Sequence, residues 1–419
     1  MGVTVADEGT VEPQWVRLES IDLSKIVKIV QADPTSNLDN IIEDGHRTEF
    51  EQLETLPLWH IVAVVQDTEL KANQDTVSFA IGFFFHHGIS DGTSGAGFHL
   101  SFLEALNGLT TGATKPISKE QGIISVPKLP LLPTVETKFN FPLSIWFTVK
   151  MIFTTFVYSA EDPLHWWGPP VTSTPPEKPP TVKLQSFDLP HEMVKSLVAK
   201  CRSEGSTVTS LISVLVARKL ALMYPAFSRF TASVPIDLRK LTGNTSADMG
   251  CFVSDMNPLF SSEAVTPRGY ISCASDPAVA ASHDTKLWES ARASKALMAA
   301  RASSKTDHSV GLLKFIKDNY AGHFMGYLGK RRQAAFEVTN IMVVDGGAGV
   351  NDSSKATFDR VMFSASTPKH GYPYCILLAT AKNGSMTSTL AWEEGVMENE
   401  EASELIKWLE TSLGEIAGQ

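Results

Sequence analysis

Two overlapping motifs share one short stretch, "FFFHHGISDGTSG" at residues 83–95, and each places a different reactive group at the same turn. In the spacing H-H-x-x-x-D-G, His87 is a base with Asp91 and Gly92 behind it. In the spacing G-x-S-x-G, Ser90 is the nucleophile of a hydrolase. The stretch therefore predicts a histidine base or a serine nucleophile, unless it is a core turn without chemistry.

The histidine interpretation follows from the position of His87 just after an apolar strand. Imidazole titrates near neutral pH and is suited to removing a proton from a hydroxyl group. We expect Asp91 to brace the turn rather than react, because a buried carboxylate must be paired. Gly92 would let the next helix approach the sheet. His86 points to the opposite side and is interpreted as structural, with a role in the site as the alternative.

The serine interpretation needs an acid and a histidine later in the chain, and Asp345 and His370 could supply them. It also needs an oxyanion loop of the H-G-G-G kind before the nucleophile, and the sequence has none there. A serine hydrolase that uses Ser90 is therefore the weaker alternative.

The elements around the motif are a strand before it and a helix after it. Residues 59–66 and 76–85 have strand patterns, and the second is apolar on both faces, which predicts a central strand. A helix is expected from Gly92 onward. Further strands between 336 and 392, and a final helix at about 399–415, complete a mixed α/β (α+β) fold.

The chain has 419 residues, which favours two domains. Residues 166–180, "WWGPPVTSTPPEKPP", hold six prolines, and proline-rich stretches form stiff connectors. We therefore expect an N-terminal subdomain at 1–165, a crossover at 166–180 and a C-terminal subdomain at 181–419.

Composition excludes several classes of protein. A net charge of −10 argues against nucleic-acid binding, which needs a basic footprint. The four cysteines have no C-x-x-C spacing, so no metal site is expected, and a reducing, cytoplasmic location fits best.

Residues 141–160 are nearly apolar and have Lys150 as their only charge. A charge at the centre of a membrane span costs about 2.5–3.5 kcal/mol. We expect a buried or interface helix, with peripheral contact to a membrane surface as the alternative.

The stretch "HHGISDG" resembles the signature of the CoA-dependent acyltransferase superfamily. This superfamily includes the chloramphenicol-acetyltransferase-like fold, the BAHD enzymes, the alcohol acetyltransferases and the condensation domains of peptide synthetases. Four further segments resemble the same superfamily: "LPLWHIVAV", "VPIDLRKL…MGCFVSD", "VTNIMVVD" and "GSMTSTLAWEEGVM". The likeness runs from about Trp59 to residue 415 and is nearest to the fungal alcohol acetyltransferases. The late D-F-G-W-G motif of BAHD enzymes is absent; the nearest string is "VVDGGAG".

The resemblance implies two similar subdomains with an active-site tunnel between them. By the same resemblance, His87 would be the general base that deprotonates a hydroxyl for direct attack on an acyl thioester. Asp91 is structural, and Arg239 is the candidate partner for it. Asn340 or Ser366 would stabilise the oxyanion. A CoA tail needs cations, and the densest basic cluster, with a solvated helix end as its alternative interpretation, is Lys314, Lys317, Lys330, Arg331 and Arg332.

The function expected from this resemblance is transfer of an acyl group, an acetyl group in the first instance, from acyl-CoA to the hydroxyl of a small secondary-metabolite alcohol, with no permanently bound cofactor. The alternatives are a condensation-type enzyme that uses a carrier-protein thioester, and a cyclase, pericyclase or binding protein on the same scaffold. The family's opening helix and strand have no counterpart before "VTVADEGTVEPQWVRL", so a partner chain could supply that piece.

Overall fold

The structure is a computed structural model that describes residues 2–418 apart from several segments. The segments outside the description are 8–9, 11–12, 67–76, 111, 114–121, 154–161, 172–180, 266–284, 316–319, 350–351, 353 and 369. The chain divides into two compact units. Unit 1 consists of Met1–Lys138, Gly243–Phe252 and Gly349–Thr357, and unit 2 consists of Phe139–Thr242, Val253–Ala348 and Phe358–Gln419.

Unit 1 contains three small sheets and the strand–turn–helix that carries the motif. Its largest sheet has the order β4–β5–β6, with β4 parallel to β5 and β6 antiparallel to it. The described elements of unit 1 are β1 (Val3–Ala6), β2 (Gln14–Arg17), β3 (Ser20–Asp22), η1 (Leu23–Lys25), β4 (Val27–Gln31), α1 (Asp39–Arg47), β5 (Trp59–Val65), β6 (Phe79–Phe85), α3 (Gly92–Thr110), β7 (Ile123–Ser125) and α4 (Val135–Lys138).

Strand β6 is apolar on both faces because a helix covers each of them. The ring of Phe83 stacks on Phe98 of α3, with centroids 4.0 Å apart. The ring of Phe84 meets His46 of α1 edge-on at 5.8 Å. The prediction of a strand was confirmed, but the expected central position was wrong: in the described part of the sheet, β6 is an edge strand.

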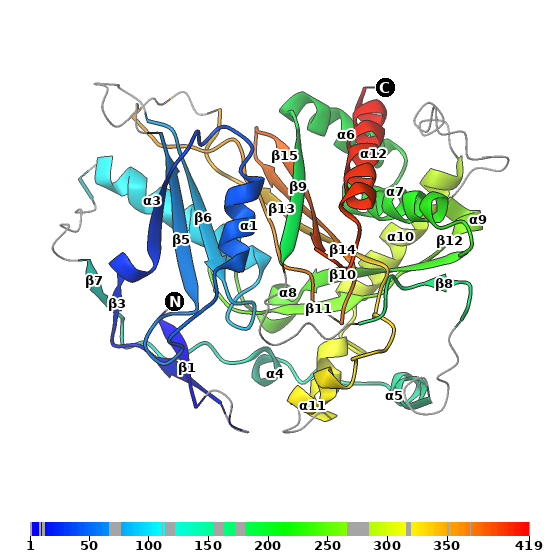
Figure 1. The fold of residues 1–419 in the computed structure, drawn as a ribbon, viewed down its shortest axis with the longest axis horizontal. Coiled ribbons are helices and arrows are strands. Elements are labelled where there is room, and N and C mark those ends of the chain that lie inside the picture. Colours follow the sequence, from blue (N-terminus) through cyan, green and yellow to red (C-terminus); the bar gives the residue numbers. More distant parts are fainter. Residues whose placement is uncertain are drawn as a thin grey trace. The chain divides into compact units, whose positions relative to one another are not determined.

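Unit 2 is built on an eight-stranded mixed sheet, ordered β11–β10–β13–β14–β15–β9, with β12 and β8 also paired to β10 (Figure 1). Strands β10, β13 and β14 are parallel neighbours, and β15 is antiparallel to β14 and β9. Its described elements are α5 (Ile145–Ile152), β8 (His165–Trp166), β9 (Val182–Leu189), α6 (His191–Ser203), α7 (Val208–Met223), β10 (Arg229–Asp237), α8 (Arg239–Thr242), β11 (Val253–Met256), β12 (Leu259–Ser261), α9 (Ser262–Val265), α10 (Thr285–Ser303), η4 (Ser309–Phe315), α11 (Tyr320–Met325), β13 (Phe336–Val344), β14 (Tyr374–Ala381), β15 (Met386–Glu393) and α12 (Asn399–Ala417).

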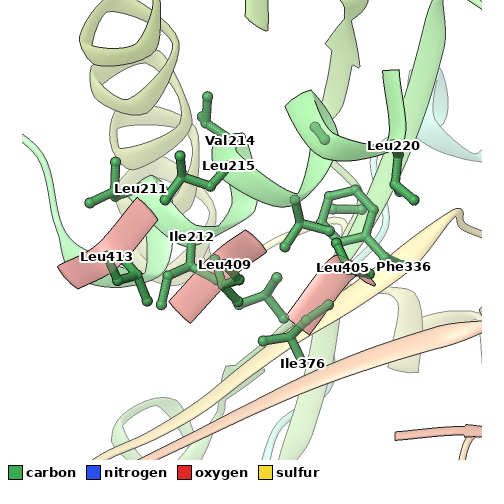
Figure 2. Close-up of a cluster of buried hydrophobic side chains, with 14 of the residues drawn as sticks. Leu211, Ile212, Val214, Leu215, Leu220, Phe336, Ile376, Leu405, Leu409 and Leu413 are labelled. Carbon is green, nitrogen blue, oxygen red and sulfur yellow. The ribbon is translucent and has the colours of Figure 1, made fainter. Parts of the chain in front are cut away.

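The core of unit 2 lies where α7 and α12 pack on this sheet. Figure 2 shows leucine and isoleucine side chains of α7 gathered with Leu405, Leu409 and Leu413 of α12 and with Phe336 and Ile376 of the sheet. Helix α7 is apolar on almost all sides because it is enclosed by the sheet and by neighbouring helices. The strands predicted between residues 336 and 392 and the final helix predicted at about 399–415 are confirmed as β13, β14, β15 and α12.

The two units are not separated at the proline-rich stretch. The contact division falls between Lys138 and Phe139, and two later segments of the chain return to unit 1. The expected boundary at residue 166 therefore does not coincide with the division between the two units. Residues 172–180 of the expected crossover lie outside the described residues.

The apolar stretch at 141–160 forms only a short described helix, α5. Ile145 and Trp146 are 84% and 77% exposed, so a buried helix was the wrong expectation for this part. Within the described residues, no single helix is long and apolar enough to span a membrane. Helices α6 and α7 taken together have sufficient length and apolar composition, but they form a bent pair.

The carboxyl group of Glu337 is buried in the sheet of unit 2. It accepts hydrogen bonds from Thr339 Oγ1 (2.6 Å), Ser233 Oγ (3.4 Å) and Cys375 Sγ (3.4 Å). Burial raises the pKa of Glu337, and these hydrogen bonds oppose only part of that rise.

We expect Leu409→Ala to lower the free energy of unfolding by about 2–5 kcal/mol, because it removes a fully buried side chain from the core of unit 2. Leu297→Ala on α10 is the matched control, since Leu297 is 47% exposed, and its loss should stay under about 1 kcal/mol. Urea unfolding measures both, and equal losses would contradict the described packing.

Glu337 should make stability depend on pH. A carboxyl group with a raised folded-state pKa stabilises the fold most below its unfolded pKa, and this contribution is lost as pH rises through the folded pKa. Glu337→Gln has no such loss, so its stability relative to the wild type should improve as pH rises above about 4.3. Melting temperatures across pH test this, with Glu289→Gln on the exposed face of α10 as control; parallel curves for wild type and Glu337→Gln would refute it.

Candidate functional site

The motif forms a tight turn between β6 and α3. His86 N–H donates to the carbonyl of Leu58 (2.9 Å), and Ile89 N–H donates to the carbonyl of His86 (3.0 Å). The Nδ1 atom of His86 accepts a hydrogen bond from Gly88 N–H at 3.0 Å, so this ring is turned back on its own turn. His87 is exposed at the tip.

Asp91 is buried beneath the turn, with 2% of its surface exposed. Its Oδ1 accepts from the N–H and the hydroxyl of Ser94, both at 2.9 Å, which caps the first turn of α3. Its Oδ2 accepts from Phe252 N–H at 3.0 Å. One carboxylate thus joins the helix start to a segment 161 residues away in sequence.

Ser94 makes a second connection to the same segment. Its Oγ lies 3.1 Å from the N–H of Gly250, which donates to it, and 3.0 Å from the carbonyl of Gly250. Residues on both sides of Cys251 are therefore held by Asp91 and Ser94. Neither Ser94 nor Cys251 was singled out from the sequence as part of the site.

The thiol of Cys251 lies beside the exposed histidine, with 3.8 Å between Sγ and His87 Nδ1. Three further histidines of unit 1 are desolvated, which lowers the pKa of His46, His60 and His99 to about 4. Those three rings stay neutral at physiological pH and are enclosed, whereas the His87 ring is open to reactants.

Ser90 is fully buried, with 0% of its surface exposed, and its Oγ has no hydrogen-bond partner among the residues that the structure describes. A hydrolase nucleophile must be exposed and paired with a base. The candidate partners also have other contacts: Asp345 binds Lys382 at 2.6 Å, and the ring of His370 stacks on Tyr327. The structure contradicts the serine-hydrolase interpretation.

The remaining predicted site residues lie in unit 2, apart from Gly92, which is the first residue of α3. Arg239 is buried and its Nη1 lies 3.3 Å from Asp237 Oδ1. Asn340 donates to Thr209 Oγ1 (3.0 Å) and accepts from Met342 N–H (2.7 Å), and Ser366 is exposed. The pairing of Arg239 with Asp91 and the two oxyanion roles stay predictions.

The role expected of Gly92 stays a prediction, but two later glycines of α3 lie close to neighbouring groups. A Cβ atom on Gly95 would lie 3.4 Å from the ring of Phe85, and one on Gly97 would lie 2.7 Å from the carbonyl oxygen of Ser246. Only glycine fits at position 97 without moving backbone.

The basic residues proposed to bind CoA do not form one surface cluster. Arg332 is 2% exposed and its Nε donates to the carbonyl of Pro169 (2.9 Å), so it is structural rather than available to a phosphate. The guanidinium of Arg331 lies 4.2 Å from the centre of the Trp167 ring, and both residues line a cavity of about 900 Å³ within unit 2. Lys314 and Lys330 are exposed, and Lys317 lies outside the described residues.

We expect Asp91→Asn to lower the free energy of unfolding by about 1–3 kcal/mol, because the new NH2 group must face a buried N–H donor of Ser94 or Phe252. Asp33→Asn is the control: Asp33 accepts from Thr35 N–H in a similar turn that is exposed. Chemical denaturation measures both variants, and an equal, small effect would show that Asp91 does not brace the turn.

Comparison with known proteins now adds to this geometry. The family model for alcohol acetyltransferase matches residues 48–413. A probable alcohol acetyltransferase FCK4 of Fusarium pseudograminearum is 23% identical over 96% of this chain and 80% of its own, and a probable alcohol acetyltransferase crmB of Aspergillus fumigatus is 25% identical over 94% and 82%.

The solved structure of TRI3 trichothecene 15-O-acetyltransferase from Fusarium sporotrichioides is 12% identical, covers 99% of this chain and 82% of its own, and superposes with a TM-score of 0.66. This likeness confirms the predicted fold class. Because the family match spans most of the sequence, the chain belongs to the alcohol acetyltransferase family and is an acyltransferase.

Proposed function

We propose that this enzyme transfers an acyl group, an acetyl group in the first instance, from CoA to the hydroxyl of a small secondary metabolite, with His87 as general base. The observation that carries the proposal is the exposed imidazole at the tip of the β6–α3 turn, in the motif that the superfamily uses for this step. The curated relatives are named probable alcohol acetyltransferases, which supports the alcohol as acceptor.

In this reaction the ring nitrogen that faces away from Cys251, Nε2, takes the proton of the acceptor hydroxyl. The oxygen then attacks the thioester carbon, and the tetrahedral intermediate collapses as the carbon–sulfur bond breaks. The CoA thiolate leaves with the proton that the ring had accepted. Asp91 takes no proton; it holds the turn and the helix start so that His87 stays in place.

Donors for the oxyanion and for the CoA tail belong to the same proposal. Asn340 and Ser366 remain candidates for the oxyanion, since a preorganised donor contributes several kcal/mol at such a site. Two exposed cations, Arg331 and Lys330, remain candidates for binding the phosphates of CoA. The proposal also includes peripheral contact with a membrane surface, because Ile145 and Trp146 are exposed apolar side chains.

His87→Ala should lower kcat/KM for acetyl transfer to a responsive alcohol by about 10²–10⁴-fold, the range that a positioned general base contributes. Ser90→Ala should leave both activity and stability nearly unchanged, because Ser90 Oγ is buried without a partner. Product formation from acetyl-CoA across a panel of alcohols, followed by mass spectrometry, measures both.

Three outcomes would overturn the proposal in different ways. Loss of activity in Ser90→Ala, with labelling of Ser90 by a fluorophosphonate, would indicate a hydrolase. Transfer only from a carrier-protein thioester would indicate a condensation-type enzyme. Conversion of a substrate with no thioester present would indicate a cyclase.

A further inference from the structure

Cys251 is a thiol within reach of the exposed imidazole. Its Sγ lies 3.8 Å from His87 Nδ1, and the residue is half-buried. The other described cysteines, Cys201 and Cys375, are each 1% exposed in unit 2. Burial raises the pKa of the Cys201 thiol to about 12 and raises that of Cys375 well above its ordinary value, so both stay protonated and shielded.

The position of Cys251 is built by the same turn that presents His87. Gly250, just before it, is bound through N–H and carbonyl to Ser94 Oγ, and Phe252, just after it, donates its N–H to Asp91. The backbone on both sides of the thiol is therefore fixed to the turn. These bonds place the backbone of Cys251 next to the turn that carries His87.

Thiolate, not thiol, is the nucleophile of cysteine, and a neighbouring imidazole that takes the proton makes a cysteine reactive. We propose that Cys251 and His87 form a thiol–imidazole pair, that soft carbon electrophiles modify Cys251 ahead of the other described cysteines, and that the adduct stops acyl transfer. The loss of transfer rests on the function proposed above; the reactivity of the thiol does not.

The alkylation step balances within this pair. With iodoacetamide, the Sγ–carbon bond forms, the carbon–iodine bond breaks, iodide leaves, and the thiol proton passes to His87 Nδ1 and then to water. The two uses of the ring need opposite tautomers. Nδ1 must be bare to accept the thiol proton, whereas Nδ1 carries hydrogen when Nε2 acts as base on the acceptor.

Other ionisable groups on the elements that hold the thiol are engaged elsewhere. His86 Nδ1 accepts from Gly88 N–H, and Asp91 is bound to Ser94 and Phe252. Asp248, on the segment of Cys251, accepts from Thr245 N–H at 2.8 Å. The nitrogen Nδ1 of His87 lies 3.8 Å from Sγ.

The test is the rate of alkylation by iodoacetamide from pH 5 to 10, mapped by peptide mass spectrometry on the full chain in a Cys273→Ala background, because Cys273 lies outside the described residues. We expect Cys251 to be labelled first in the folded protein. In His87→Gln the midpoint of its pH profile should rise, and its rate at pH 7 should fall about tenfold for each pH unit of that rise. His86→Gln, next along the chain, is the matched control and should leave the profile in place.

Acyl transfer is measured on the same samples. Labelling of wild type should remove activity in step with modification of Cys251, and Cys251→Ala should keep its own untreated activity after exposure to iodoacetamide. A labelling rate at Cys251 that is the same in wild type and His87→Gln would overturn the pair, as would full activity of the labelled enzyme. If no donor supports transfer but labelling still depends on His87, the proposed function fails and the reactive pair stands.

Discussion

The site of unit 1 depends on the carboxylate of Asp91. It lies where β6 gives way to α3, and its two oxygens bind donors from different parts of the chain, the start of α3 and Phe252 N–H. A buried carboxylate costs several kcal/mol unless it is bound in this way, so these hydrogen bonds offset the cost of burial and fix the turn together. The motif therefore separates two tasks: one residue holds the backbone, and another, His87, is left exposed.

The turn also explains why the two chemistries predicted by the overlapping motifs are not equally compatible with the structure. A strand–turn–helix can present only part of its side chains outward. Ser90 points into unit 1 and is shut off from substrate, while His87 lies outward. Burial, rather than the letters of either motif, argues against Ser90 as a nucleophile.

Local patterns were sufficient to predict β6, α3 and α12, because alternation and helical spacing are properties of the segment itself. They could not show what covers each face. The two apolar faces of β6 predicted a central strand, but helices α1 and α3 cover these faces and β6 lies at an edge of the described sheet. The apolar stretch of α5 predicted a buried or interface helix, and the exposure of Ile145 and Trp146 argues against burial.

Within the site, the sequence indicated His87 and Asp91 because they fall in one short motif. It did not indicate Cys251, which meets His87 across 164 residues of sequence, and no local period marks such a contact. Likewise, five basic residues near one another in sequence predicted a cluster, but the buried Arg332 shows that neighbours along a chain need not share a surface.

Whether His87 removes the proton of the acceptor is tested most directly by acyl transfer to a series of alcohols of increasing acidity, with wild type and His87→Ala. A general base matters less when the acceptor gives up its proton more easily. If His87 is the base, the deficit of His87→Ala in the rate of transfer shrinks steadily along the series. A deficit that stays constant from the least to the most acidic alcohol would contradict it.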